Sequence, residues 1–206
     1  MKNLCYLLAF FLLLACSENN TQSKTERGHE TDTLNSGITN EEKVKVLWRD
    51  SSAKLVINQT YCKGISEPEK AAIGYVATFV GNDCEWEGNT ENLKCSVISA
   101  LNLGYQCSET HLGFLRNWFK GDTAVLNELE NCPQTPNTAT VQESFDELEI
   151  SSNGNTIVVF YKASGINLRE GKSWNYSEVV SFEKDNERIR LKNKERSEVK
   201  MEQIQE

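Results

Sequence analysis

The residues best suited to nucleophilic chemistry in this chain are one histidine and a few cysteines. The chain has two histidines, and because His29 lies in a polar N-terminal stretch, a mechanism that needs a folded imidazole depends on His111. Cys107 precedes His111 by four residues, and Cys95 is a second candidate thiol. A thiolate activated by a neighbouring imidazole is the arrangement that cysteine hydrolases use. One hypothesis is therefore a hydrolase in which His111 acts with Cys107 or Cys95.

A structural role for His111 is the favoured alternative. His111, Leu115 and Trp118 recur at the spacing of one apolar helix face, where a histidine with a satisfied hydrogen bond is an ordinary core residue. Cys107 lies before Ser108, the expected N-cap of that helix, and is also a disulfide candidate. A serine nucleophile has no better support, because the sequence contains no G-x-S-x-G motif. We therefore assign no catalytic residue.

One acidic segment has part of the pattern of a calcium-binding loop. Asp83-Cys84-Glu85-Trp86-Glu87-Gly88 places acids at positions 1, 3 and 5 and glycine at position 6, with Glu91 at position 9. Position 12 is Lys94, where an EF-hand has its bidentate glutamate. The cysteines contain no C-x-x-C pair, which zinc sites typically use. We expect neither a metal nor another cofactor.

Two further pairs of side chains could bind a ligand. Glu147 and Glu149 share a face of a predicted strand and could serve as the paired carboxylates of a glycosidase. Trp174 and Tyr176 alternate on another strand and could stack on a sugar or contact a protein. Ordinary interpretations are favoured for both, because acids on a solvated strand face are common and these aromatic residues also supply the apolar alternation of a core.

The charge of the chain argues against a nucleic-acid partner. The sequence has 22 basic and 30 acidic residues, a net charge of −8, and neither half has the basic excess that phosphate binding needs. Arg188, Arg190 and Lys192 form a basic row on the last predicted strand. Such a row typically protects a sheet edge from strand addition, and binding of an acidic partner is the alternative.

The N-terminus contains a short targeting segment. Lys2 precedes the apolar run Leu4 to Ala15, which has the length of a signal-peptide core and is too short to span a bilayer. Its last residues, Leu13-Leu14-Ala15-Cys16, resemble the lipobox of bacterial lipoprotein precursors. The resemblance covers only these first residues, and the alternative is an ordinary cleaved signal peptide. It implies removal of residues 1–15, fatty acylation of Cys16 and, because Ser17 follows, anchoring in the outer membrane.

The rest of the chain divides by composition. Residues 16–42 are polar and predict a lipidated, disordered tether. Its 26 residues from Ser17 have an r.m.s. reach of about 25 to 30 Å. Residues 43–193 predict a single folded domain, and the charged tail 194–206 is expected to fray.

Five cysteines remain after Cys5 is removed with the signal peptide and Cys16 is acylated. An exported chain meets oxidising conditions, so disulfides are expected in the helical part. The sequence leaves 15 arrangements of two bridges open. Cys84 and Cys107 flank the helix predicted from Glu91 to Tyr105, and Cys62 and Cys132 flank the whole helical part. We therefore favour Cys62 with Cys132 and Cys84 with Cys107. Cys95 would then be the free thiol.

The domain is predicted to be α+β, because the spacing of its apolar residues changes from a helical period of 3.6 to the strand period of 2. Residues 66–132 have helical spacing and predict a disulfide-stapled lobe of three to four helices. Residues 145–193 alternate with period two around the turn Asn153-Gly154-Asn155 and predict a four-stranded antiparallel meander, with a short strand or hairpin expected at 43–57. The element at 145–150 also fits a helical turn.

These observations favour a lipid-anchored envelope lipoprotein that acts as a non-enzymatic binding module. An inhibitor, an immunity protein and an envelope-assembly factor are all compatible with the sequence. We expect two partners, the membrane through the lipid on Cys16 and a protein of unknown identity. The alternative is an envelope hydrolase that uses His111 with a free cysteine.

Overall fold

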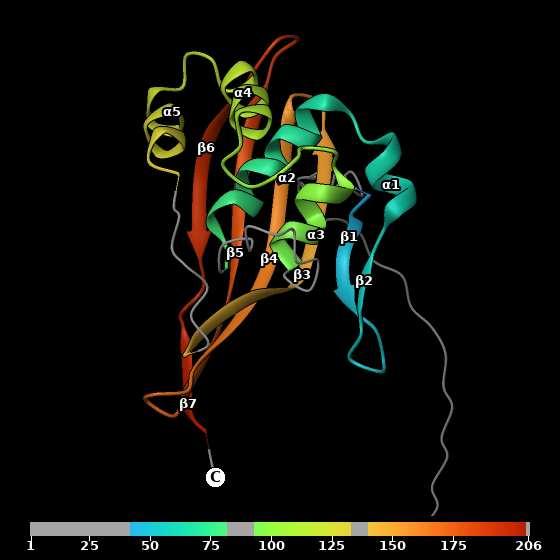
Figure 1. The fold of residues 1–206 in the computed structure, drawn as a ribbon. Coiled ribbons are helices and arrows are strands. Elements are labelled where there is room, and N and C mark those ends of the chain that lie inside the picture. The colour runs from blue at the N-terminus through green and yellow to red at the C-terminus, as the bar shows by residue number, and fades with distance from the viewer. Residues whose placement is uncertain (1–41, 82–92, 133–139, 205–206) are drawn as a thin grey trace, which may run out of the picture. The chain divides into compact units, whose positions relative to one another are not determined.

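The computed structural model describes residues 42–81, 93–132 and 140–204, all within the compact unit formed by residues 38–206 (Figure 1). The predicted α+β class is confirmed. A helical region spans residues 59–130 and contains the Cys107–Cys132 disulfide, and the antiparallel β3–β6 meander follows it. No helix within the described ranges is long and apolar enough to cross a membrane.

Seven strands form one antiparallel sheet, in which the order is β2-β1-β3-β4-β5-β6 and β7 pairs with β5. The short hairpin expected at 43–57 forms one edge of this sheet, because its first strand also pairs with β3. The predicted hairpin turn is also confirmed, since Asn153 pairs with Thr156 and Gly154 has a φ of +55°. The strands are β1 (Val44–Arg49), β2 (Leu55–Ile57), β3 (Val141–Asn153), β4 (Thr156–Asn167), β5 (Lys172–Lys184), β6 (Ile189–Arg196) and β7 (Lys200–Gln203).

The helices cover one face of this sheet (Figure 1). Three of them begin at a side-chain N-cap: Ser66 forms a capping box with Glu69, Ser108 accepts a hydrogen bond from the His111 amide, and Asp122 accepts one from the Val125 amide. The helices are α1 (Gln59–Gly64), α2 (Glu67–Phe79), α3 (Leu93–Ala100), α4 (Glu109–Trp118) and α5 (Thr123–Glu130).

The local structure departs from what the sequence predicts in three places. The apolar spacing of Leu93, Val97, Leu101 and Tyr105 predicts a helix that reaches Tyr105, but α3 ends at Ala100 because Asn102 and Gly104 adopt positive φ angles. The tail was expected to fray from residue 194, but β6 continues to Arg196 and Lys200–Gln203 pairs with β5. Helix α1 was not predicted.

The core lies between the helical layer and the covered face of the sheet. Its centre is a cluster of three aromatic rings, in which the ring centroids of Tyr75 and Phe119 are 5.1 Å apart and those of Phe119 and Phe182 are 6.0 Å apart. These rings come from α2, the end of α4 and β5, and all are almost fully buried. Aromatic packing therefore joins the helical layer to the sheet.

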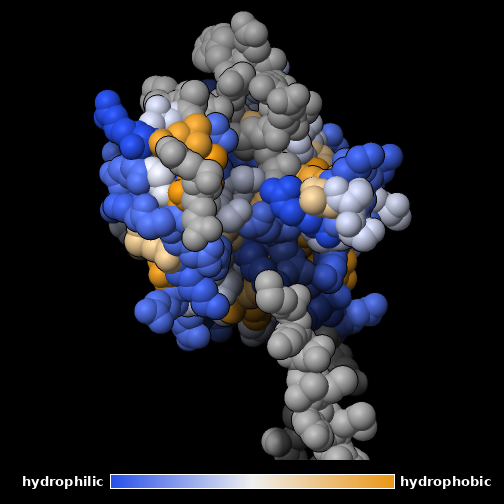
Figure 2. Space-filling view, turned by 90° about the horizontal axis from the view of Figure 1, so that it is seen from below, coloured by the Kyte–Doolittle hydropathy of each residue, from blue (hydrophilic) through white to orange (hydrophobic). Residues whose placement is uncertain are grey.

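The opposite end of the sheet from the β3–β4 turn is formed by the β4–β5 hairpin and β7, at the bottom of Figure 1. Figure 2 shows the molecule from this side. The visible surface is largely hydrophilic, with separate hydrophobic areas on its flanks. This end extends beyond the helical layer.

Candidate functional site

His111 is fully buried and occupies a defined hydrogen-bond network. Its Nδ1 accepts the Cys107 backbone N–H at 3.0 Å, so the ring proton is assigned to Nε2, which lies 3.3 Å from the Thr78 Oγ1. The Thr78 hydroxyl in turn donates to the Gly74 carbonyl at 2.7 Å. Burial lowers the pKa of His111 to about 4, so the ring is neutral near pH 7. This is the structural histidine that the helical spacing favours.

Acidification should therefore destabilise the fold in part through His111. Because its pKa is lowered from 6.5 to about 4, its stabilising contribution is complete above pH 6.5 and is lost as the pH falls toward 4. The shift corresponds to about 3 kcal/mol. In urea unfolding at each pH, we expect the His111→Asn variant to lose less stability than the wild type across this interval, because Asn Oδ1 can still accept the Cys107 N–H. Equal losses in both proteins would contradict this assignment.

The predicted cysteine pairs are wrong. Cys107 bonds to Cys132, with the two Cα atoms 6.0 Å apart, because the chain turns back between α4 and α5 and brings their outer ends together. This bond excludes both Cys62–Cys132 and Cys84–Cys107, and Cys84 itself lies outside the described residues. Cys95 is also disulfide-bonded and is not the free thiol, whereas Cys62 in α1 is free and buried.

The hypothesis of a cysteine nucleophile beside His111 consequently loses both of its candidate thiols. Cys107 contacts His111 through its backbone amide while its sulfur is oxidised. The remaining thiol, Cys62, is only 4% exposed, and burial raises its pKa, so the thiolate is disfavoured. These sulfurs and this imidazole serve the packing of the helical layer.

Lys94 is 2% exposed and lies at the end of α2. Its ammonium donates to the Thr78 carbonyl at 3.2 Å and to the Gly81 carbonyl at 3.1 Å. Helix α2 has no basic residue in its own last turn, so α3 supplies the cation that its C-terminus favours. The calcium-like segment from Asp83 to Glu91 lies outside the described residues. Within the described residues, no three His, Cys, Asp or Glu side chains lie together in a way that could hold a metal ion.

Glu147 is the centre of an ion-pair cluster on the sheet face without helices. It accepts hydrogen bonds from Lys162 Nζ at 2.5 Å and from Lys45 Nζ at 2.6 Å, and Lys45 is also 3.5 Å from Glu149. The bonds to Lys162 and Lys45 lower the pKa of Glu147. A glycosidase acid needs a raised pKa, so this pair does not have the electrostatics of glycoside hydrolysis.

An open groove of about 340 Å³ crosses β3, β4 and β5. We call it the strand groove. Strand alternation places the small polar side chains of Ser144, Ser164 and Asn175 on one face of the sheet. The groove is lined by Gln142, Glu143, Ser144, Ser164, Gly165, Ile166, Ser173, Trp174 and Asn175.

Trp174 and Tyr176 have different roles. The Trp174 indole lies directly against Gly165, where an added Cβ would be 2.2 Å from the ring, so β4 has glycine at this cross-strand position. Trp174 also lines the strand groove. Tyr176 is 8% exposed, packs at 6.1 Å from the Tyr161 ring and donates to Glu143 at 2.6 Å. Only Trp174 is therefore available to a ligand.

A smaller cavity of about 130 Å³ lies between α2 and strands β4 to β6. The buried Glu178 lines it and accepts from Arg196 Nε at 2.6 Å, while Lys194 pairs with Glu128 at 3.2 Å. The Tyr75 hydroxyl also donates to Glu128. Glu178 in the cavity and Glu128 beside it are thus each paired with a basic residue of β6, and these contacts join α5 and β6 to the core.

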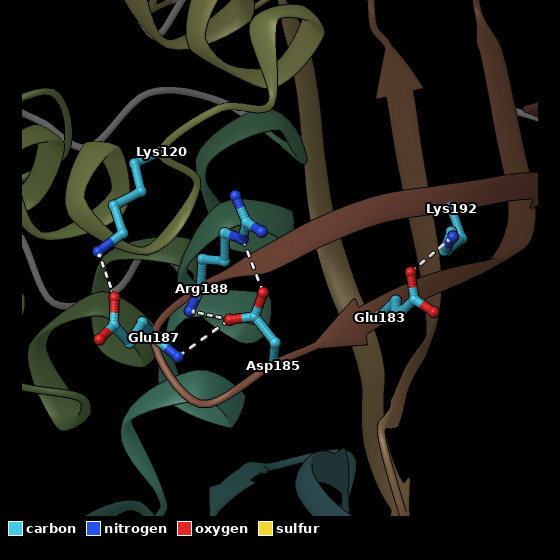
Figure 3. Close-up of polar contacts among 6 residues, drawn as sticks. All are labelled: Lys120, Glu183, Asp185, Glu187, Arg188 and Lys192. Atoms are coloured by element: carbon cyan, nitrogen blue, oxygen red, sulfur yellow. Dashed lines mark hydrogen bonds and ion pairs between the residues drawn. The ribbon is translucent and has the colours of Figure 1, made fainter.

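The predicted basic row is largely neutralised by its own hairpin (Figure 3). Arg188 Nε donates to Asp185 at 2.7 Å, and the same carboxylate accepts the Glu187 and Arg188 amides at 3.0 Å. Lys192 is 2.7 Å from Glu183 on the neighbouring strand. The hydrogen bonds from the Arg188 side chain and from the Glu187 and Arg188 amides lower the pKa of Asp185 and shape the β5–β6 turn. The row therefore fits a protected sheet edge better than a site for an acidic partner.

Sequence reasoning identified Trp174 but missed the rest of the strand groove. Its other residues are mainly serine, asparagine and glutamine, which have no motif spacing and come from three strands. A pattern of small polar residues on one face of adjacent strands is the signal that could have found it. No protein family, curated protein or solved structure gives a significant match to this chain.

Proposed function

We propose that this chain is a bacterial envelope lipoprotein, anchored in the outer membrane by lipid on Cys16, that binds a protein partner and has no catalytic activity of its own. Inhibition of a hydrolase or toxin, immunity, and envelope assembly are the roles within this class. The anchor is supported by Leu13-Leu14-Ala15-Cys16 at the end of a short apolar segment.

The strand groove is the observation that carries the binding role. It is open, and it offers hydroxyl and amide groups from Ser144, Ser164 and Asn175 beside the apolar Ile166, which the register places on the same face of the sheet. An open groove fits a loop or an extended segment of a protein better than a small molecule, because small ligands bind in pockets that enclose most of their surface. We place the protein partner in this groove.

The rival function, a hydrolase using His111 with a free cysteine, has less support. His111 is neutral and buried, and Cys107 and Cys95 are both disulfide-bonded. A His111→Asn variant that folds normally and loses a measurable hydrolytic activity would reverse this preference.

Filling the strand groove should abolish partner binding without unfolding the domain. Ser164 is partly buried and faces Ser144 and Asn175 on the neighbouring strands, so Ser164→Trp would occupy the groove. We expect at least a tenfold loss of the protein that copurifies with the affinity-tagged full chain from crosslinked envelopes. The measurement is quantitative mass spectrometry of the purified complexes.

Ser181→Trp is the matched control. Ser181 is a partly buried serine on the same face of the sheet, on β5, and lies outside the groove. It should retain the partner at the wild-type level. Equal recovery with both variants, or recovery of no partner at any salt concentration, would count against the proposed binding role.

A further inference from the structure

The strand groove runs across the strands rather than along them. Six of its residues face away from the helices and form two rows, which the register sets two residues apart on each strand. The row between them turns its side chains to the other face, so its backbone forms the floor of the groove. One wall consists of Gln142, Ile166 and Ser173, the other of Ser144, Ser164 and Asn175, and the floor of Glu143, Gly165 and Trp174.

These dimensions fit one extended chain. Two residues along a strand separate the walls by about 7 Å, and three strands give the groove a length of about 10 Å. An extended chain advances about 3.3 Å per residue, so about three residues of a partner span the groove. The floor at Gly165 is already paired with β3 on one side and β5 on the other. Recognition therefore falls to the side chains of the two walls.

The walls carry hydrogen-bonding groups and no charge. Each wall side chain except Ile166 ends in a hydroxyl or an amide, groups that both donate and accept. Ser164, Ser173 and Asn175 make no side-chain hydrogen bond to a described residue, so their polar groups are available to a partner. The charged residue of the floor, Glu143, points to the other face of the sheet, where it accepts from the Tyr176 hydroxyl at 2.6 Å.

The charges around the groove balance. Beyond one wall, Lys162 is paired with Glu147 at 2.5 Å. At the other wall and at the β7 end, residues 166–175 and 198–204 together carry three basic and three acidic side chains. These are Arg169, Lys172 and Lys200, and Glu170, Glu198 and Glu202. An ionic side chain of a partner would therefore lose its water in this groove without gaining a counterion from the walls, which is costly.

We infer that the strand groove receives an uncharged, extended segment of the protein partner, about three residues long, and rejects a segment with a charged side chain there. This inference rests on the proposed function and deepens it by naming the chemistry of the segment. An uncharged segment exchanges hydrogen bonds with the hydroxyl and amide groups of the walls and places an apolar side chain against Ile166. The cost of burying an ion discriminates against other partners.

Substitutions that differ in charge and not in size test this inference. Ser164 is the middle residue of its wall, with Ser144 and Asn175 on either side. The affinity-tagged full chain is purified from crosslinked envelopes as Ser164→Asp, Ser164→Asn, Ser164→Lys and Ser164→Gln. Mass spectrometry quantifies the protein that the wild type recovers. We expect Ser164→Asp to recover at least fivefold less of it than Ser164→Asn, and Ser164→Lys at least fivefold less than Ser164→Gln.

The same four substitutions at Ser181 are the matched controls, because Ser181 lies on the same face of the sheet and outside the groove. They should all recover the wild-type amount. Urea unfolding of each variant checks that the domain stays folded. Ser144→Asp and Ser144→Asn repeat the comparison on β3, so that a steric loss at Ser164 leaves a second test of charge.

Several results would overturn the inference. A loss with one sign of charge and normal recovery with the other would show that the partner presents a charged segment. Equal recovery by all four variants, while Ser164→Trp abolishes binding, would show that the groove binds the partner without selecting against charge. Loss of recovery after periodate oxidation of the envelopes would identify a saccharide as the occupant. Normal recovery with Ser164→Trp would instead reject the groove as the binding site, and with it the proposed binding role.

Discussion

Replacing Cys16 with serine is expected to move the protein from the membrane fraction to the soluble fraction. The lipobox resemblance implies three acyl chains on this residue, and each buried methylene contributes about 0.8 kcal/mol to membrane binding. Serine cannot form the thioether that carries the diacylglyceryl group. Because two chains already give stable anchoring, the ratio of bound to free protein should fall by a factor of about 100 or more.

The measurement is fractionation of washed envelopes together with mass spectrometry of the N-terminal peptide. Cys5→Ser is the matched control, because Cys5 lies within the apolar segment that the resemblance assigns to the removed signal peptide. This variant should remain membrane-bound. Retention of Cys16→Ser in washed membranes, or a wild-type protein with an unmodified Cys16 thiol, would contradict lipid anchoring.

Replacing Phe182 with alanine should cause the largest loss of stability from a single core substitution. Phe182 is fully buried, and its ring centroid lies 5.9 Å from that of Tyr75 and 6.0 Å from that of Phe119. Truncation of a buried phenylalanine leaves a cavity and costs about 3 to 5 kcal/mol. We expect the free energy of unfolding, measured by urea titration, to fall by about 4 kcal/mol.

Phe160→Ala is the control for this substitution. Phe160 lies on the sheet face without helices, is partly buried, and has the Lys162 ammonium 5.7 Å from its ring centroid. Its truncation should cost less than about 1.5 kcal/mol, since no helix packs on it and water can fill the space. Similar losses at both positions would mean that the uncovered face is as tightly packed as the core.

Local signals in the sequence mark the starts of α2 and α4. Ser66 with Glu69, and Ser108 before an amphipathic run, mark N-termini by hydrogen bonds that form within three or four residues of each other. The end of α3 was misplaced because Leu101 and Tyr105 continue the apolar spacing past Asn102 and Gly104, whose residue types favour the positive φ angles that end the helix. The apolar spacing was given more weight than this stop signal.

The strands show the limit of reasoning from apolar periods. The 145–150 element was ambiguous because a bulge between Phe145 and Glu147 interrupts its alternation, and its pairing with β4 decides the conformation. Strand β7 has no buried residue and forms through backbone hydrogen bonds to β5. A charged, exposed sequence such as Lys200–Gln203 carries no burial signal that could predict it.

The candidate site was only partly predictable for a related reason. The disulfide depends on how α4 and α5 turn back, which brings Cys107 to Cys132, and spacing along the chain favoured other pairs. The strand groove combines Ser144, Ser164 and Asn175 from three strands, so it exists only once the register is set. Trp174 was identifiable because its size and alternation are visible in one segment.

The pairing of β1 with β3 also determines when this domain can be completed. Lys45 and Glu147 are 102 positions apart, and the whole helical region lies between their strands. Contacts of such long separation form slowly because a large loop must close first. Nearly three quarters of the chain must therefore be synthesised before β1, which can already pair with β2, gains β3 on its other edge.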